Sequence, residues 1–389
     1  MPETTVKFIR SQGVTYPIED DTKVAKNQGT THAGLYLAVG DDGNVTLKEG
    51  GVNKKVYTFT IPFTDSSANI QYYDDAYGTT EARRRDIIRS WARHAVVKNG
   101  VIQYWLDKNN LNKKEDGSAS NLTGTDGDVM LLYKPLWWRC SHVNDGETTI
   151  SIADWDFDPG NTVTAHRYGE STICSYLGLG VFEGIIQSSA LRSVAVNSNP
   201  TVNTTNDAFY NAAVYGRTSL TNAHYNQMLP LTWTLYSILL LFEGGNRNVQ
   251  VKWGRGCVDK TWTGSYEGVT VTAGWDATTP WNRNNNSGTT GVTAGGIQNM
   301  WGNTWTFFGE FLKETDNKAY FTVRGGADHQ LISASGHPST WHTVQMTGVS
   351  GAYVKDIIGD VYTPFLPRTT GASDSTYCAE DCYSSNTRN

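Results

Sequence analysis

The sequence is poor in charge. Asp, Glu, Lys and Arg make up 18% of its 389 residues, below the usual quarter, and the net charge is −6. Binding to nucleic acid through its phosphates needs a basic patch, so this balance argues against that class. The one dense basic run, Arg83–Arg85, falls on a predicted helix. We interpret it as a solvated face, with a phosphate clamp as the alternative.

The sequence also lacks the motifs of common enzyme classes. There is no Gly-x-Ser-x-Gly nucleophile turn, and no pair of histidines has the spacing of a zinc site. Gly-containing pieces such as Leu177–Gly180 are not followed by Gly-Lys-Ser/Thr, which a phosphate loop requires. Carboxylate pairs for glycoside cleavage are recognised by geometry rather than by sequence. We therefore do not expect an enzyme.

Long hydrophobic runs are missing as well. The first residues, MPETTVKFIRSQ, contain no apolar core of a signal peptide. The longest apolar segment, Leu231–Phe242, covers only about a dozen residues, whereas a membrane span takes about 20. We expect no membrane insertion. The five cysteines are irregularly spaced and favour free, mostly buried thiols: Cys140, Cys174, Cys257, Cys378 and Cys382.

Aromatic residues (12%) and 39 glycines are abundant, which is typical of β-rich proteins with short strands and tight turns. Strands are predicted at Leu35–Val39, Val101–Leu106 and Val129–Trp138, and at Val56–Ile61, whose alternation indicates one buried face. Asn109–Thr125 is predicted to be an exposed loop. Helices are predicted at Thr80–Val96 with Thr80 as N-cap, at Asp207–Tyr215, and at Leu231–Phe242. The last is apolar nearly all round and belongs in a core.

Several segments, in this order, resemble phage tail receptor-binding proteins with a C-type-lectin-like domain, the group that includes the major tropism determinant. They are Asp126–Met130, the helices Asp207–Tyr215 and Leu231–Phe242, the turn Gly254–Cys257 after a predicted strand, and the strand pair Gly296–Trp305. The resemblance covers roughly residues 70–385. Such proteins usually continue past the segment matching Thr376–Cys378 into a Gly- and Trp-rich stretch, whereas this sequence ends at Asn389.

The resemblance implies an α+β, β-rich fold. An N-terminal β region (1–65) for attachment and oligomerisation would precede an intermediate β-rich domain (66–197). A C-type-lectin-like domain (198–389), with two helices packed on a twisted antiparallel sheet, would follow. The implied protein is a homotrimeric tail or fibre component of a virion, assembled in the host cytoplasm beside other tail proteins. It would bind a host cell-surface glycan or protein. The alternatives are a structural virion subunit without a receptor and an enzyme of the formylglycine-generating fold class.

Two segments are candidates for binding. The Gly/Asn/Trp-rich insert offers residue types enriched at binding hot spots and in adaptable loops, namely Trp275, Trp281, Asn282, Arg283, Asn284, Asn285 and Asn286. The alternative is a surface hairpin whose tryptophans cap the core. The second candidate is Asp154, Asp156 and Asp158, which alternate and could hold calcium on one side of a strand. The alternative is a solvated strand edge. No other cofactor is expected.

Overall fold

The structure is a computed structural model. It describes residues 8–11, 14–17, 35–39, 45–49, 54–62, 68–144, 147–196, 200–201, 204–214, 224–257, 277–282, 289–304, 306–314, 318–331, 336–345, 353–357 and 360–372. The chain forms two compact units, Met1–Lys55 and Val56–Asn389. The finer division predicted at residues 66–197 and 198–389 lies within the second unit.

The first unit contains two antiparallel hairpins. β1 (Phe8–Ser11) pairs with β2 (Val14–Pro17), and β3 (Leu35–Val39) pairs with β4 (Val45–Glu49). The strand predicted at Leu35–Val39 is thereby confirmed.

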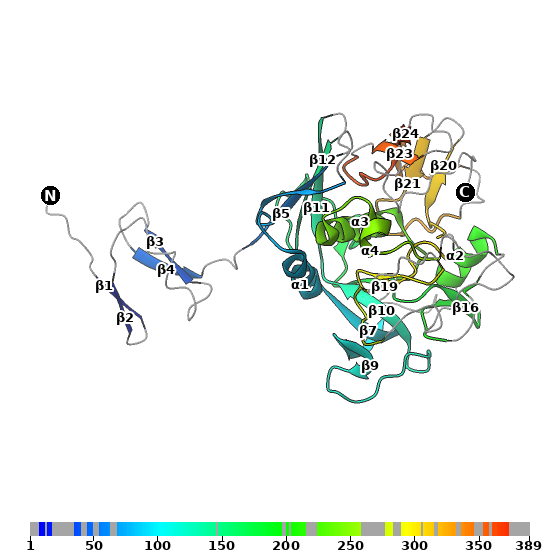
Figure 1. Cartoon of the computed structure of the whole chain (residues 1–389), viewed down its shortest axis with the longest axis horizontal. Helices are drawn as coiled ribbons and strands as arrows, with labels where there is room; N and C mark the ends of the chain where they lie inside the picture. The colour runs from blue at the N-terminus through cyan, green and yellow to red at the C-terminus, as the bar shows by residue number, and fades with distance from the viewer. Residues whose placement is uncertain are drawn as a thin grey trace. The chain divides into compact units, whose positions relative to one another are not determined.

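Two antiparallel sheets dominate the second unit (Figure 1). The five-stranded sheet has the order β15-β10-β7-β8-β9, with strands β15 (Leu177–Gly180), β10 (Asp128–Tyr133), β7 (Ala92–Lys98), β8 (Val101–Asp107) and β9 (Asn110–Lys114). The four-stranded sheet has the order β11-β12-β5-β6, with strands β11 (Trp137–Asn144), β12 (Glu147–Ala153), β5 (Tyr57–Pro62) and β6 (Gln71–Asp74).

Several predicted strands differ in detail. Every residue of β5 is buried, so the expectation of one buried face was wrong. The buried threonine hydroxyls are satisfied by hydrogen bonds to β12, from Thr58 to Ser151 and from Thr60 to Thr149. The strand predicted at Val129–Trp138 is divided between β10 and β11, which belong to different sheets. The loop predicted at Asn109–Thr125 contains β9, and Leu111 and Leu122 within it are buried.

Helix α1 (Glu81–Trp91) begins where the sequence predicts. The Thr80 hydroxyl accepts a hydrogen bond from the Arg83 backbone N–H at 3.2 Å, which satisfies one unpaired N–H of the first turn. The helix ends earlier than predicted, because Ala92 already takes an extended conformation and starts β7. Ala92 and Ala95 still contribute to the core, from a strand rather than from a helical face.

Helix α3 (Pro230–Gly244) is the centre of the second unit (Figure 1). All of its residues except Trp233 are buried, which confirms the prediction of a core helix. Phe242 packs against Tyr57 and Phe59 of β5, with ring centroids 5.6 and 5.9 Å apart. Tyr236 donates its hydroxyl to the Ala294 carbonyl at 2.9 Å. Gly245 ends the helix in the left-handed conformation (φ 68°), which glycine adopts without strain.

Shorter elements surround this core. The helices are α2 (Asn206–Val214) and α4 (Val249–Trp253). The strands are β13 (Arg167–Tyr168), β14 (Thr172–Ile173), β16 (Ile185–Gln187), β17 (Ala190–Arg192), β18 (Thr293–Ala294), β19 (Ile297–Gln298), β20 (Phe311–Lys313), β21 (Lys318–Phe321), β22 (His342–Gln345), β23 (Tyr353–Ile357) and β24 (Pro367–Ala372).

Two of these elements test the predicted motif order. The segment before Gly254 is helix α4 rather than a strand, because the Asn248 side chain accepts from the Val251 backbone N–H and caps a helical turn. Of the strand pair predicted at Gly296–Trp305, the described residues contain only β19, and it pairs with β18, which precedes Gly296. All ladders between named strands in the described ranges are antiparallel, so the α+β, β-rich class is confirmed.

Candidate functional site

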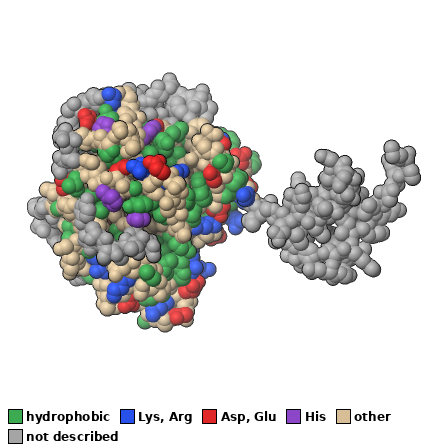
Figure 2. Space-filling model, turned by 180° about the vertical axis from the view of Figure 1, so that it is seen from behind, with side chains coloured by type: hydrophobic (Ala, Val, Ile, Leu, Met, Phe, Trp, Pro, Cys, Tyr) green, Lys and Arg blue, Asp and Glu red, His purple; other side chains and the backbone are tan. Residues whose placement is uncertain are grey.

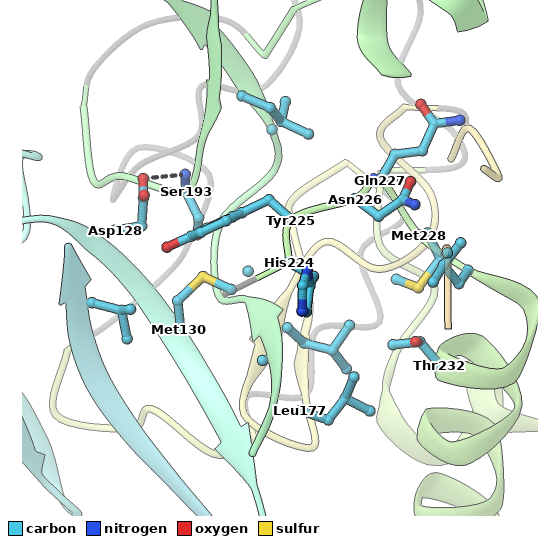
Figure 3. Close-up of a pocket in the computed structure, with 18 of the residues that line it drawn as sticks. Asp128, Met130, Leu177, Ser193, His224, Tyr225, Asn226, Gln227, Met228 and Thr232 are labelled. Carbon is cyan, nitrogen blue, oxygen red and sulfur yellow. Dashed lines mark hydrogen bonds between the residues drawn. The ribbon is translucent and has the colours of Figure 1, made fainter. Parts of the chain in front are cut away.

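A cavity of about 1180 Å³ lies in the second unit (Figure 3). Strands β10 and β15 contribute Met130, Leu132 and Leu177, and the start of α3 contributes Thr232. Gly178 lies between the two leucines of β15. A Cβ there would approach the side chains of Met130 and Leu132 to 3.1 Å, so glycine lets β15 lie against β10 without displacing them.

The segment before α3 carries polar side chains to this cavity. Figure 3 shows His224, Tyr225, Asn226 and Gln227 side by side, with the Tyr225 ring extending toward Asp128 of β10. The Tyr225 hydroxyl accepts a hydrogen bond from the Gly100 backbone N–H at 3.0 Å. Gly100 belongs to the turn between β7 and β8, so this bond links the segment to the five-stranded sheet.

Two histidines flank Tyr168 at the cavity. The His224 ring stacks on the Tyr168 ring, with centroids 3.4 Å apart and planes 7° apart, and the Tyr168 hydroxyl lies 3.3 Å from His329 Nε2. His224 and His329 are exposed. Desolvation lowers the pKa of His224, and the charge of His329 lowers it further. Histidine side chains are visible among uncharged and hydrophobic groups on the face shown in Figure 2.

Gly325 lets the segment that carries His329 lie close to β13. Gly325 has φ of +63°, and a Cβ there would lie 1.7 Å from the Arg167 carbonyl oxygen. Only glycine lets the 325–329 segment approach β13 so closely. The Gly169 backbone N–H donates to the Arg324 carbonyl at 2.9 Å and stabilises this approach of the two segments.

The two carboxylates of the cavity wall are engaged by hydrogen-bond donors. Asp128 accepts from Arg192 Nε at 2.7 Å and from the Ser193 backbone N–H at 3.1 Å. Glu183 accepts from Asn299 Nδ2, Asn303 Nδ2 and Thr304 Oγ1 at 3.0, 2.6 and 2.6 Å. Both carboxylates are therefore engaged in hydrogen bonds within the protein.

Glu310 lies behind this wall. It is fully buried, and its Oε1 accepts from the His329 backbone N–H at 3.0 Å and from the Tyr210 hydroxyl at 3.3 Å. Burial, followed by the charge of Asp328, raises the pKa of Glu310 to about 7. A buried acid with a raised pKa is a reason to inspect a site. Glu310 is not among the residues that line the cavity.

The predicted binding insert is only partly described. Trp281 is buried and packs edge-on against His94, and its Nε1–H donates to Glu243 Oε2 at 3.0 Å. Asn282 is half-buried and donates to Glu243 Oε1 at 2.7 Å. These contacts contradict a surface role for Trp281 and agree with the alternative in which it caps the core. The remaining candidates lie outside the described residues: Trp275, Arg283, Asn284, Asn285 and Asn286.

The predicted calcium ligands are separated rather than gathered. Asp154 pairs with Lys134 Nζ at 2.7 Å, Asp158 pairs with Arg139 Nη1 at 2.6 Å, and Asp156 accepts from the Thr162 hydroxyl. The described residues contain no group of three or more acidic, His or Cys side chains that could hold a metal ion. The calcium prediction was therefore wrong, because β12 ends at Ala153 and each aspartate after it is engaged by a different partner.

The basic run was also misinterpreted in part. Arg83 is exposed, but Arg84 is buried and donates from Nε and Nη2 to the Glu243 carbonyl, at 3.2 and 3.1 Å. Arg85 binds Glu243 Oε1 at 2.6 Å. This part of the run ties α1 to the C-terminal end of α3, where a cation is favourable.

Sequence patterns gave little warning of the cavity. His224, Tyr168, Gln227 and Gln298 are far apart in the chain and carry no motif spacing. Only the Gly325–Gly326 pair could have indicated a close backbone approach. Cys140 is free and buried as expected, Cys257 is also buried, and Cys174 is half-buried, whereas Cys378 and Cys382 lie outside the described residues.

Two broader findings frame the site. Within the described ranges, no helix has both the length and the apolar character needed to cross a bilayer. Comparisons of the chain with protein-family models, curated proteins and solved structures find no match.

Proposed function

We propose that the chain is a virion tail or fibre protein that binds a host cell-surface receptor, glycan or protein, through the cavity beside β10 and β15. The observation that carries the proposal is the cavity itself. Its volume of about 1180 Å³ is large enough for a ligand, and its walls combine methionine, aromatic and amide side chains. The virion assignment rests on the resemblance of the motif order, and a C-type-lectin-like arrangement around α3 is part of the proposal.

The chemistry of the wall favours binding over catalysis. Asp128 and Glu183 are held by donors and do not serve as a free acid and base. A thiol nucleophile works as the thiolate and needs a lowered pKa. Burial instead raises the pKa of Cys140 to about 12 and also raises the pKa of Cys174, which lines the cavity. These shifts do not support the formylglycine-generating alternative.

We assign attachment to other tail proteins to the first unit, whose hairpins form a compact unit of their own. Several copies, such as a homotrimer, would raise the effective affinity of weak individual contacts. We place the receptor site in the second unit and the contacts with the virion in the first.

Binding of fluorescently labelled full-length protein to intact host cells tests this proposal. Leu177→Trp adds bulk to the cavity wall, and we expect at least about tenfold weaker binding, which corresponds to about 1.4 kcal/mol. Val251→Trp is the matched control, because Val251 is an exposed apolar residue of α4 outside the cavity wall. Circular dichroism and the melting temperature check that both variants fold.

The outcomes separate the alternatives. Saturable binding that Leu177→Trp weakens and Val251→Trp does not would support the cavity as the receptor site. Equal binding by both variants would move the site elsewhere on the protein. Absence of wild-type binding to cells that the parent particle infects would reject receptor binding and favour a structural virion subunit.

A further inference from the structure

β15 is an edge strand of the five-stranded sheet, and all four of its residues, Leu177–Gly180, line the cavity. Among the strands that the structure describes, it pairs with β10 alone. An edge strand presents a row of backbone N–H and C=O groups with which a further chain can pair. The side of β15 that faces away from β10 is therefore a candidate surface for binding.

The register of the ladder shows which residue of β15 uses this side. Val129 of β10 accepts the Val181 backbone N–H at 3.1 Å, so the backbone groups of Val129 are directed toward β15. These groups alternate in direction along an antiparallel strand. Leu132, three residues further on, therefore directs its groups toward β7. Gly178 is the residue opposite Leu132, so the N–H and C=O of Gly178 point away from β10.

A partner molecule can reach Gly178. The residue is exposed, and because glycine has no side chain, the exposed surface consists of backbone atoms. Among the described residues, no hydrogen bond outside the ladder with β10 involves its N–H or C=O. One donor and one acceptor are thus open to a ligand at the cavity wall, on a surface that bulk solvent already reaches.

The sheet beside this edge is apolar. Met130 and Leu132 lie next to Gly178, because a Cβ on the glycine would come within 3.1 Å of both side chains. Tyr176 also lines the cavity; it is 46% exposed and meets Trp105 of β8 edge-on, with ring centroids 5.8 Å apart. Apolar side chains on a neighbouring strand are stabilised by packing against such groups.

We infer that the free edge of β15 binds an extended polypeptide segment of a partner protein, which adds to the sheet as a further strand. This inference rests on the proposed function and makes the receptor a protein. The residue of the segment opposite Gly178 donates its N–H to the Gly178 carbonyl and accepts the Gly178 N–H. Backbone bonds of this kind give affinity, and alternate side chains packed on Met130, Leu132 and Tyr176 give specificity.

The walls of the cavity indicate one strand rather than a second copy of this chain. Besides β15, they include Phe209 and Val214 of α2 and the segment 224–229. A segment of about four residues, at about 3.3 Å each, matches the length of β15. A single extended segment enters a space bounded in this way, whereas the sheet edge of a second copy would bring its neighbouring strands against α2 and residues 224–229.

The test uses full-length protein and a displayed library of random peptides about twelve residues long. Selected peptides are synthesised with a fluorophore, and their Kd is measured by fluorescence anisotropy. The key variant is Gly178→Pro, which removes the outward N–H at a position where an edge strand tolerates proline. Gly178→Ala is the matched control, because it adds a Cβ at the same place and keeps the N–H.

We expect selected peptides to carry large apolar residues at alternate positions. They should bind the wild type and Gly178→Ala with similar Kd, and Gly178→Pro about tenfold more weakly. The two variants should have the same melting temperature, since neither loses a hydrogen bond of the ladder. A lower melting temperature for Gly178→Pro than for Gly178→Ala would show that this N–H is paired inside the protein and would overturn the inference.

A second measurement changes only the peptide. Each peptide N–H is replaced in turn by an N-methyl group, which cannot donate a hydrogen bond. Pairing with β15 predicts weaker binding at every second position, because alternate N–H groups face the sheet. Losses without this alternation, or no loss at any position, would contradict strand pairing even if Gly178→Pro did not fold.

Competition with intact host cells separates this inference from the proposed function, and the selected peptide should block cell binding. Cell binding that Leu177→Trp weakens, together with peptides that do not respond to Gly178→Pro, would retain the proposed function and reject the peptide edge. A smaller oligomer for Gly178→Pro than for Gly178→Ala would assign the edge to a second copy and overturn the inference. Alternating peptide binding without any cell binding would retain the edge as a peptide site and reject the proposed function.

Discussion

Trp281 donates its indole N–H to Glu243 Oε2 at 3.0 Å, and this bond anchors the predicted binding insert to the core at Trp281. Glu243 lies at the end of α3 and also accepts from Arg85 and Asn282, so one buried carboxylate joins three segments. A buried charge is tolerated when it is paired in this way. The insert is therefore held by the core at this end, whatever its remaining residues contact.

Trp281→Ala is expected to lower the free energy of unfolding by about 3–5 kcal/mol, because it removes a buried aromatic side chain and leaves a cavity. Urea unfolding at pH 7 measures the change. Tyr77→Ala serves as the control, since Tyr77 is 80% exposed and should shift stability by no more than about 0.5 kcal/mol. Equal stabilities for the two variants would contradict the buried position of Trp281.

Arg84→Met is expected to destabilise the protein by about 2–4 kcal/mol, because it removes charge-assisted bonds to the carbonyl oxygens of Glu243 and Thr79. Arg83→Met makes the same chemical change one residue earlier, at an exposed side chain, and should be nearly neutral. Thermal unfolding of the two variants compares them directly. The contact between α1 and α3 would be disproved if Arg83→Met cost as much as Arg84→Met.

Glu310 is expected to make stability fall as pH rises. The folded protein keeps the Glu310 proton up to pH about 7, whereas the unfolded chain releases it near the ordinary pKa of 4.5. Between pH 4.5 and about 7 the folded state therefore holds one more proton than the unfolded chain. The free energy of unfolding falls as pH rises through this window, by at most about 3 kcal/mol. Glu310→Gln should remove this slope and exceed the wild type in stability at pH 8.

Urea midpoints at pH 4, 5, 6, 7 and 8 measure both proteins. Identical slopes for the wild type and Glu310→Gln would show that the buried carboxyl does not titrate in this range.

His94 is expected to act in the opposite direction. His94 is buried, and burial lowers its pKa from the ordinary 6.5 to about 4, so the folded protein resists protonation of this ring. The unfolded chain gains a proton as pH falls below 6.5 while the folded protein does not, so stability is lost between pH 6.5 and about 4. His166, whose pKa burial also lowers to about 4, adds to the same loss.

His94→Gln should reduce the acid sensitivity by up to about 1.4 kcal/mol per pH unit within that window. The amide can still donate to the Gly296 carbonyl, which His94 Nε2 meets at 2.9 Å. Unfolding curves at pH 7 and pH 5 give the comparison. A variant as acid-sensitive as the wild type would rule out a contribution from His94.

The sequence predicted those elements whose cause is local. Thr80 caps α1 because a hydroxyl placed there meets the Arg83 N–H, and Gly245 ends α3 because glycine adopts a positive φ freely. The apolar run Leu231–Phe242 could only be a buried helix. These features depend on neighbouring residues, so a sequence pattern was sufficient to find them.

The misassignments concern residues whose role depends on distant partners. Nothing near Ala92 marks the change from helix to strand, which follows from pairing with Tyr133 of β10. Asp154, Asp156 and Asp158 alternate in sequence, but Lys134, Thr162 and Arg139 draw them apart. Trp281 has the composition of a binding loop, yet its partner Glu243 lies 38 residues away.

Composition and hydrophobic periodicity are enough to predict a β-rich chain of low charge around one apolar helix, because both follow from local physical chemistry. The position of the candidate site depends instead on how distant segments pack together. Tyr168, His224, Gln298 and His329 meet at one cavity only because β13, β19, the segment before α3 and the loop after Gly326 converge there. The burial and the hydrogen bonding of these side chains result from that packing, so the sequence alone does not reveal them.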